Sequence, residues 1–349
     1  MAYTTIDKPT DYFNTITYTG SGTSTAYTVG FSPNFVWVKK RDTEATDHYL
    51  FNTISGTEEA LYSNLTNAEE TNANSVTSFD ANGFTSGNSG GTNQSGHGYV
   101  AWNWKAGTSF TNDASATGIG TIDSTGSVNT DAGFSIISYT GTGSAGTVAH
   151  GLGAVPKMII IKSRNTTSLW GVYHQAIGNT HGLFLNATNA ATSLSAYWNN
   201  TSPTSSVFSL GGDADINKSS DPLIAYCFAP KSGFSSMGQY TGNGNASSGT
   251  FIYTGFKPAF VMIKRTDSAT GGYWVMFDNK RNTFNVMDKY LFAQASDAED
   301  TSNLIDFYSI GFRPIVSNLM HNGSGASYIY MAFAENPFVT STGVPACAR

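Results

Sequence analysis

Charged residues are scarce in this sequence. Only 12% of its 349 residues are Asp, Glu, Lys or Arg, and the formal net charge is −6. Lys and Arg form no cluster that could neutralise a row of phosphates, which argues against nucleic-acid binding. No apolar run approaches the roughly 18 residues that a membrane-spanning helix needs. We therefore expect neither a nucleic-acid partner nor membrane insertion.

Cysteine is also scarce. Cys227 lies in an apolar run and Cys347 lies near the last residue, which is too little for a disulfide framework. Residues 1–11 have no apolar centre, so we expect no signal peptide. These features fit a protein that assembles in a reducing cytoplasm and leaves the cell by lysis.

Aromatic and small polar residues are abundant, and they recur in order. The chain contains three diverged copies of a unit of roughly 100 residues. Each copy opens with Tyr-Thr-Gly-x-Gly, at Tyr18, Tyr139 and Tyr240, and continues with Pro and an apolar run that ends in Lys39, Lys162 or Lys264. Each copy closes on an apolar strand that contains Trp104, Phe228 or Phe333. The Lys-to-aromatic spacings are 65, 66 and 69 residues, so the repeat is not a chance match.

The repeated blocks predict β-strands. They are short, rich in Val, Ile, Tyr, Phe and Trp, and bounded by Gly, Asn, Ser and Pro. We expect an all-β protein of three tandem, diverged β-sandwich domains of jelly-roll type. The predicted divisions are residues 1–106, a linker at 107–132, 133–233, and 234–349 with a C-terminal tail; the folded parts would span 12–106, 133–230 and 234–338. The long linker suggests that the first unit docks apart from a tight pair formed by the other two.

Six large aromatic residues occupy repeat positions and are the expected core: Trp37, Trp104, Trp170, Phe228, Trp274 and Phe333. Trp198 lies in a polar context and is the tryptophan that we expect to be exposed. Lys39, Lys162 and Lys264 are expected to cover the core with their stems and to keep their ammonium groups in water. A contact with the carboxylates of a partner is the alternative for these three lysines.

Patterns associated with catalysis occur in the wrong context. The GxGxxG match that begins at Gly141 is followed by glycines and a proline rather than a helix, so a hairpin turn is favoured. The GxSxG match around Ser89 lies in a low-complexity loop. The pairs Glu58-Glu59 and Glu69-Glu70 are expected to be solvated rather than glycosidase carboxylates. We predict no catalytic residue and no cofactor.

Metal binding is equally weakly indicated. Asp213, Asp215 and Asn217 have the alternate spacing of a calcium loop, but the sixth and twelfth positions are not Gly and Glu. A looser Ca²⁺ site in this loop stays open, with a solvated turn as the default. The histidines lack the spacing of a zinc site, so we predict no metal site.

Several segments resemble one family at the level of whole motifs. They are the opening Met1-Ala2-Tyr3-Thr4-Thr5-Ile6, the strand 99–105, the stretch 255–265 and the stretch 330–338. Together they look like a repeat family of structural and tail-fibre proteins in marine tailed bacteriophages, including cyanophage- and pelagiphage-like viruses. The resemblance covers nearly the whole chain. It implies a virion component and transfers no catalytic residues.

The expected function is therefore that of a non-enzymatic virion protein in a tail, tail fibre or host-attachment structure. The expected partners are other virion proteins, further copies of the chain, and a glycan or protein on the host surface. A capsid-surface decoration protein is the alternative within the same class. A carbohydrate-binding or glycan-cleaving module is the alternative from another class, and exposed aromatics along a groove would favour it.

Overall fold

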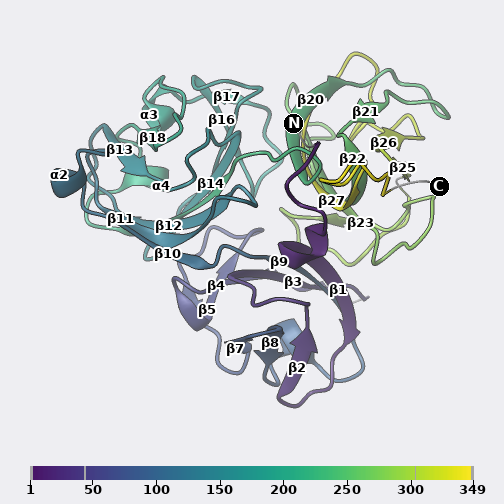
Figure 1. Cartoon of the computed structure of the whole chain (residues 1–349), viewed down its shortest axis with the longest axis horizontal. Coiled ribbons are helices and arrows are strands. Elements are labelled where there is room, and N and C mark those ends of the chain that lie inside the picture. Colours follow the sequence, from purple (N-terminus) through teal and green to yellow (C-terminus); the bar gives the residue numbers. More distant parts are fainter. Residues whose placement is uncertain (1–2, 43–44, 303, 347–349) are drawn as a thin grey trace.

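The computed structural model describes residues 3–42, 45–302 and 304–346, so Cys347 lies outside the described residues. Within these ranges antiparallel strands dominate, and the helices are single turns. This confirms the all-β prediction. None of the described helices is long and apolar enough to cross a membrane. Figure 1 shows three groups of strands arranged around a common centre.

The first unit pairs its strands in the order β1-β9-β3-β4-β5-β6, with a small outer sheet β2-β8-β7. The chain enters through the 3₁₀ turn η1 (Pro9–Asp11). The elements of the unit are β1 (Phe13–Thr19), β2 (Thr25–Thr28), β3 (Phe35–Lys40), β4 (His48–Asn52), β5 (Gly56–Tyr62), β6 (Glu70–Thr71), β7 (Val76–Asp80), β8 (Gly83–Ser86), α1 (Gly90–Asn93) and β9 (Gly98–Trp104).

The second unit has the order β10-β11-β12-β19-β14-β15-β16-β17 and an outer pair β13-β18. Its elements are β10 (Thr108–Asn112), α2 (Ala114–Thr117), β11 (Ser124–Asn129), β12 (Phe134–Thr140), β13 (Gly146–Ala149), β14 (Met158–Ser163), β15 (Gly171–His174), β16 (His181–Phe184), β17 (Thr192–Ser193), α3 (Ser195–Trp198), β18 (Val207–Leu210), α4 (Ala214–Asn217) and β19 (Pro222–Phe228).

The third unit has the order β20-β27-β22-β23-β24 and an outer sheet β21-β26-β25. Its elements are β20 (Ser235–Thr241), β21 (Ile252–Tyr253), β22 (Phe256–Arg265), β23 (Trp274–Asp278), β24 (Leu291–Phe292), β25 (Ile305–Tyr308), β26 (Gly311–Pro314) and β27 (Ser327–Pro337).

The three main sheets share one pairing scheme. In each unit the last strand lies between the first strand of the repeat and the strand that ends in the repeated lysine. The register places three aromatics at the same point of their sheets: Trp104 opposite Phe13 and Phe35, Phe228 opposite Phe134 and Met158, and Phe333 opposite Ser235 and Phe260. Lys39, Lys162 and Lys264 lie opposite Val100, Ile224 and Ile329, each four residues before that aromatic.

Each main sheet is covered on both faces. Between the main and outer sheets of the first unit lies a cluster that includes Val36, Val38 and Phe84, and matching clusters fill the other two units. The opposite faces of all three main sheets meet in one further cluster. Strands β3 and β14 are accordingly buried at every position, which explains why their sequences are apolar without alternation.

The central cluster joins the three units, which the sequence predicted as separate domains in tandem. It combines Trp104 from the first unit, Phe228 from the second and Phe333 from the third, so the units share a central core in addition to the cluster that each encloses between its own sheets. The first unit packs against both others and does not dock apart from them (Figure 1).

The expected linker at 107–132 is structured. It contains β10 and β11, which extend the sheet of the second unit through the pairing of β11 with β12. Its Ser, Thr and Gly residues suggested a linker, but β10 is the edge strand of the sheet and most of its side chains are exposed or half-buried, so an apolar sequence is not needed there. Asp113 caps the helical turn α2 by accepting hydrogen bonds from the backbone N–H groups of Ser115 and Ala116.

Candidate functional site

The six aromatics predicted as core all lie in the central cluster. Each is exposed by 2% or less. The rings of Trp104, Phe228 and Phe333 form a triangle: centroid distances are 6.5 Å from Trp104 to Phe228, 5.7 Å from Trp104 to Phe333 and 6.1 Å from Phe228 to Phe333. Equivalent strand positions therefore converge on one axis, and these residues have no access to a ligand.

Each pair of units is joined by the same backbone contact, which we call a seam. The N–H groups of Glu69, Ala191 and Glu299 donate to the carbonyls of Arg164, Thr266 and Arg41, at 2.7, 2.8 and 3.0 Å. The donors are equivalent by repeat position, and so are the acceptors. One seam joins units 1 and 2, the second joins units 2 and 3, and the third joins units 3 and 1. The three units therefore close a ring.

Tryptophans reinforce two of the seams. Trp170 Nε1 donates to the carbonyl of Tyr62 at 2.9 Å, and Trp274 Nε1 donates to the carbonyl of Phe184 at 2.8 Å. At the third seam the strand position holds His48, which lies beside the backbone of Phe292. Burial lowers the pKa of His48 well below its usual value, so this imidazole is neutral.

Ion pairs distinguish the seams from one another. Arg41 forms a two-pronged contact with Glu299, with both N–O distances at 2.9 Å, and Arg164 Nε lies 2.7 Å from Glu69 Oε2. The seam between units 3 and 2 has Thr266 and Ala191 at these positions. Glu69 and Glu299 therefore hold units together, and Glu69 is not the solvated acid that the sequence suggested.

The repeated lysines lie at the seams, and the expectation that their ammonium groups reach water is wrong. Lys39, Lys162 and Lys264 are all fully buried. Lys39 Nζ donates to the carbonyl of Ser296 at 3.2 Å, and Lys264 Nζ donates to the carbonyls of Thr188 and Asn189 at 3.1 and 2.8 Å. Both thus bind backbone carbonyls of the neighbouring unit rather than carboxylates of a partner.

Burial has the same electrostatic effect on all three lysines. Loss of hydration lowers the pKa to about 8 for Lys39 and Lys162 and to about 7 for Lys264. Lys162 differs in its partners, which are the carbonyl of Thr166 and the hydroxyl of Ser168 in its own unit. Ser168 in turn donates its N–H to the carbonyl of Thr66 across the seam.

The residues of the catalytic patterns serve the fold. Gly143 of the GxGxxG match lies in the left-handed region, with φ of +70°, inside a turn. A Cβ on Gly141 would approach the carbonyl oxygen of Lys218 to 2.2 Å, which explains the glycine there. Ser89 donates its hydroxyl to Asn72 Oδ1 at 2.9 Å. Burial raises the pKa of the Cys227 thiol to about 12, so this thiol is protonated at neutral pH.

The candidate calcium loop is committed to hydrogen bonds within the protein. Asp213 caps α4 by accepting from the N–H of Asp215. Asp215 accepts from the N–H of Leu169 and from the hydroxyl of Tyr197. Asn217 is buried and binds the carbonyls of Gly211 and Ser144 at 2.6 and 2.7 Å. In the described part of the chain, no three His, Cys, Asp or Glu residues are grouped so as to hold a metal ion.

Asn217 also reveals a repeat position that the sequence analysis missed. Its Oδ1 accepts from the N–H of Thr142, and Asn93 and Asn322 accept in the same way from Ser21 and Asn243. A buried Asn thus braces each Tyr-Thr-Gly-x-Gly turn. The signal was available in the sequence, because each of these Asn residues precedes the closing strand of its unit.

Trp198 is another residue whose place differs from the expectation. It is 1% exposed, and its ring packs against Tyr173 with the centroids 5.5 Å apart. The turn α3 directs the side chain inward, so its polar neighbours in sequence do not indicate its environment. No tryptophan in this protein is available to stack on a ligand.

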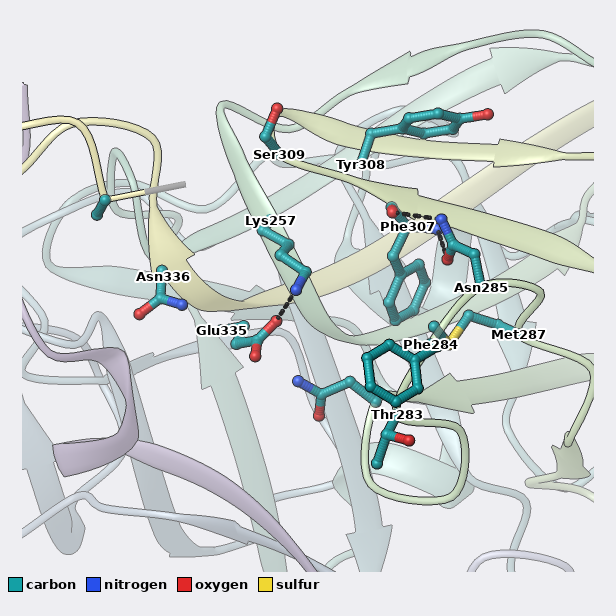
Figure 2. Close-up of a pocket in the computed structure, with 12 residues that line it drawn as sticks. Lys257, Thr283, Phe284, Asn285, Met287, Phe307, Tyr308, Ser309, Glu335 and Asn336 are labelled. Atoms are coloured by element: carbon teal, nitrogen blue, oxygen red, sulfur yellow. Dashed lines mark hydrogen bonds and ion pairs between the residues drawn. The ribbon is translucent and has the colours of Figure 1, made fainter. Parts of the chain in front are cut away.

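The third unit carries the surface that best fits a binding site. It contains a groove of about 580 Å³ between the loop 279–290, the start of β22, the end of β27 and the edge strand β25. Its lining includes Phe284, Phe307 and Tyr308 together with Lys257 and Glu335 (Figure 2). Phe284 is 77% exposed, the highest value among the large apolar residues described.

Exposed apolar side chains are concentrated in this unit. Of those described, the third unit holds Phe251, Tyr253, Phe284, Val286, Leu319, Phe338 and Val344, whereas the other two units hold Ile119 and Val155. The repeat fold alone does not require this asymmetry, because all three units share the same central pairing of strands. The third unit is therefore the part of the ring whose surface is specialised.

Comparison with known proteins places the chain in a family without adding a function. No curated protein and no solved structure matches it. One family model, described as "Domain of unknown function (DUF7483)", matches residues 8–337 and thus spans all three units and all three seams. The chain therefore belongs to the DUF7483 family.

Proposed function

We propose that this chain is a non-enzymatic structural protein of a tailed-bacteriophage virion, placed in the tail or tail fibre and contributing to host attachment. The protein would assemble in the host cytoplasm and act in the virion. The motifs shared with phage structural proteins motivate the proposal.

The closed ring of three repeats is the observation that carries the proposal. Three seams, each with the same backbone hydrogen bond, and one shared aromatic core produce a rigid body from a single chain. The outer sheets and turns of the three units then face outward with few charges, which suits hydrogen-bonded contacts with other virion proteins. Repeated outer surfaces also allow several weak contacts to act together.

The absence of an enzymatic role is part of the proposal. The hydroxyl of Ser89 and the carboxylates of Glu69 and Glu299 are held in structural hydrogen bonds and ion pairs. Glu69, one of the acids considered for a glycosidase, therefore joins two units instead of flanking a cleft. Turnover of a glycan or ester that is lost on Glu70→Gln or Ser89→Ala would contradict this.

Copy number per virion is the measurement that tests the proposal. Quantitative mass spectrometry of purified virions should give a few to some tens of copies for a tail or fibre protein. Hundreds of copies would instead identify a capsid-surface decoration protein. A chain absent from purified virions would contradict both forms of the proposal.

A carbohydrate-binding module is the second candidate. The exposed ring of Phe284 beside a groove favours it. The buried state of all six tryptophans counts against stacking of a sugar on tryptophan.

A further inference from the structure

The groove in the third unit exists because one hairpin is longer there than in the other units. Leu50 pairs with Leu61 and Val172 with Leu183, eleven residues apart in both cases. The equivalent pair, Met276 and Leu291, is fifteen residues apart. The added residues form the loop that contains Phe284, so the groove is a feature of one repeat. Loops added to a rigid scaffold commonly carry binding residues.

The loop is held in place rather than left loose. Asn285 donates from Nδ2 to the carbonyl of Phe307 at 2.9 Å, and its Oδ1 accepts from the N–H of Phe307 at 2.9 Å (Figure 2). Asn282 Nδ2 donates to Asp288 Oδ1 at 2.7 Å and braces the base of the loop. These bonds pair the loop with the edge strand β25 and leave the ring of Phe284 in solvent. An apolar ring that is kept exposed by a fixed loop is preorganised for a ligand.

One residue in the lining of the groove holds an enclosed polar atom that has no partner. Asn279 lines the groove and is 9% exposed, and its Oδ1 has no hydrogen-bond partner. A buried polar atom without a partner costs free energy unless a ligand or water supplies a donor. Lys257 and Glu335 lie across the groove from Phe284 and Phe307, and their N–O distance of 2.8 Å makes them neutral as a pair (Figure 2).

We infer that this groove binds a neutral saccharide unit of a cell-surface glycan. The apolar C–H face of a pyranose fits the ring of Phe284, and its hydroxyl groups can form hydrogen bonds with Lys257 and Glu335, which lie across the groove. Lys257 and Glu335 neutralise each other in the groove. A charged ligand is therefore disfavoured, because no unpaired opposite charge would be left to bind it. This inference rests on the proposed attachment function and assigns that function to one unit.

The test is binding of the full-length protein to an array of neutral, acidic and N-acetylated glycans, followed by NMR titration of the saccharides that bind. Phe284→Ala removes the stacking surface without touching a buried contact and should weaken binding by about tenfold. Ile119→Ala, an exposed apolar residue of the second unit, is the matched control and should leave the affinity unchanged.

Three outcomes would overturn the inference: no glycan bound, acidic glycans alone bound, or full affinity kept in Phe284→Ala. Virions that carry Phe284→Ala separate this inference from the proposed function. They should incorporate the protein at the normal copy number, because the inference assigns the groove to a glycan and not to assembly. If the protein is present in virions but binds no glycan, only the saccharide site is disproved. If the protein is missing from virions, its role in the virion is disproved, whatever ligand the protein binds.

Discussion

Trp104 and Phe333 meet edge to face with their ring centroids 5.7 Å apart, although they belong to the first and the third unit. Each is the last aromatic of its closing strand, and each is 1% exposed. The contact therefore joins, at the centre of the molecule, the two repeats that are farthest apart in the sequence. Stability should accordingly be a property of the ring and not of single units.

The first prediction concerns this central contact. Trp104→Ala removes a fully buried indole that touches Phe13, Phe35, Phe228 and Phe333. Truncation of a buried large aromatic costs about 3–5 kcal/mol. We expect urea denaturation to show that loss in one transition shared by all three units. A midpoint equal to that of the unmutated protein would mean that Trp104 is not part of the core.

The second prediction concerns the first unit on its own. Residues 12–106 contain Trp37, Trp102 and Trp104, which are buried in the shared core of the full chain. The excised unit would expose them, so we expect binding of a hydrophobic dye and no cooperative melting. Dynamic light scattering and calorimetry would check this. A sharp melting transition in the excised unit would show that the shared core is dispensable.

The third prediction uses the difference between the seams. Arg164→Thr leaves Glu69, whose side chain is 7% exposed, without its cation. Leaving a buried acceptor unpaired costs about 1–3 kcal/mol. Adding Glu69→Ala reproduces the Thr266–Ala191 pair of the seam between units 3 and 2, and we expect the double variant to regain part of that stability. Chemical denaturation of both variants is the measurement, and a double variant weaker than the single one would contradict the equivalence of the seams.

The fourth prediction is a rise in stability on the alkaline side of neutrality. The pKa values of Lys39, Lys162 and Lys264 are lowered to about 8, 8 and 7, whereas an unfolded chain keeps them near 10.5. Between pH 7 and pH 10 the unfolded state therefore binds more protons than the folded state, so the free energy of unfolding should increase with pH.

A lysine variant tests the cause of this pH dependence. Lys264→Met should reduce the slope between pH 7 and 10 by up to about 1.4 kcal/mol per pH unit, whatever it does to stability at neutral pH. Lys105→Met, at a lysine outside the seams, is the control and should keep the slope. If Lys264→Met leaves the slope unchanged, the ammonium of Lys264 stays charged in the folded protein.

The fifth prediction concerns acid. Burial lowers the pKa of His174 to about 4 and that of His321 to about 3, below the 6.5 of an unfolded chain. Below pH 6.5 the unfolded state gains protons that the folded state does not accept, so stability should fall as the pH drops toward 4. His321→Gln should flatten this loss in thermal melts recorded from pH 7 to 4. A loss of the same size in the variant would assign it to other groups.

The strands could be predicted from the sequence because the repeat presents each strand signal three times. The Pro-to-Lys run predicts β3, β14 and β22, and the continuous apolar pattern predicts burial on both faces. The burial of Lys39 and Lys264 could not be predicted, because the carbonyls that hold them belong to a neighbouring unit. No local pattern in a sequence describes a contact that forms only when the ring closes.

The groove, too, could be predicted only in part from the sequence. The spacing of 69 residues between Lys264 and Phe333, against 65 and 66 elsewhere, indicated extra residues in the third unit. It did not say that Phe284 would stay exposed or that Asn285 would fix the loop to β25. Trp198 is the opposite case, because its polar neighbours suggested exposure and a single helical turn buries it.

The ring also imposes an order on biosynthesis. A ribosome delivers the first unit before the third, and domains normally fold as they emerge. Arg41 and Trp104 of the first unit contact Glu299 and Phe333 of the third unit, which is synthesised last. A nascent chain that contains only the first two units therefore exposes the apolar side chains that the third unit covers in the complete protein. Contacts between such distant residues make folding slow. Truncated translation products should therefore be insoluble, and correct folding should follow release of the third unit.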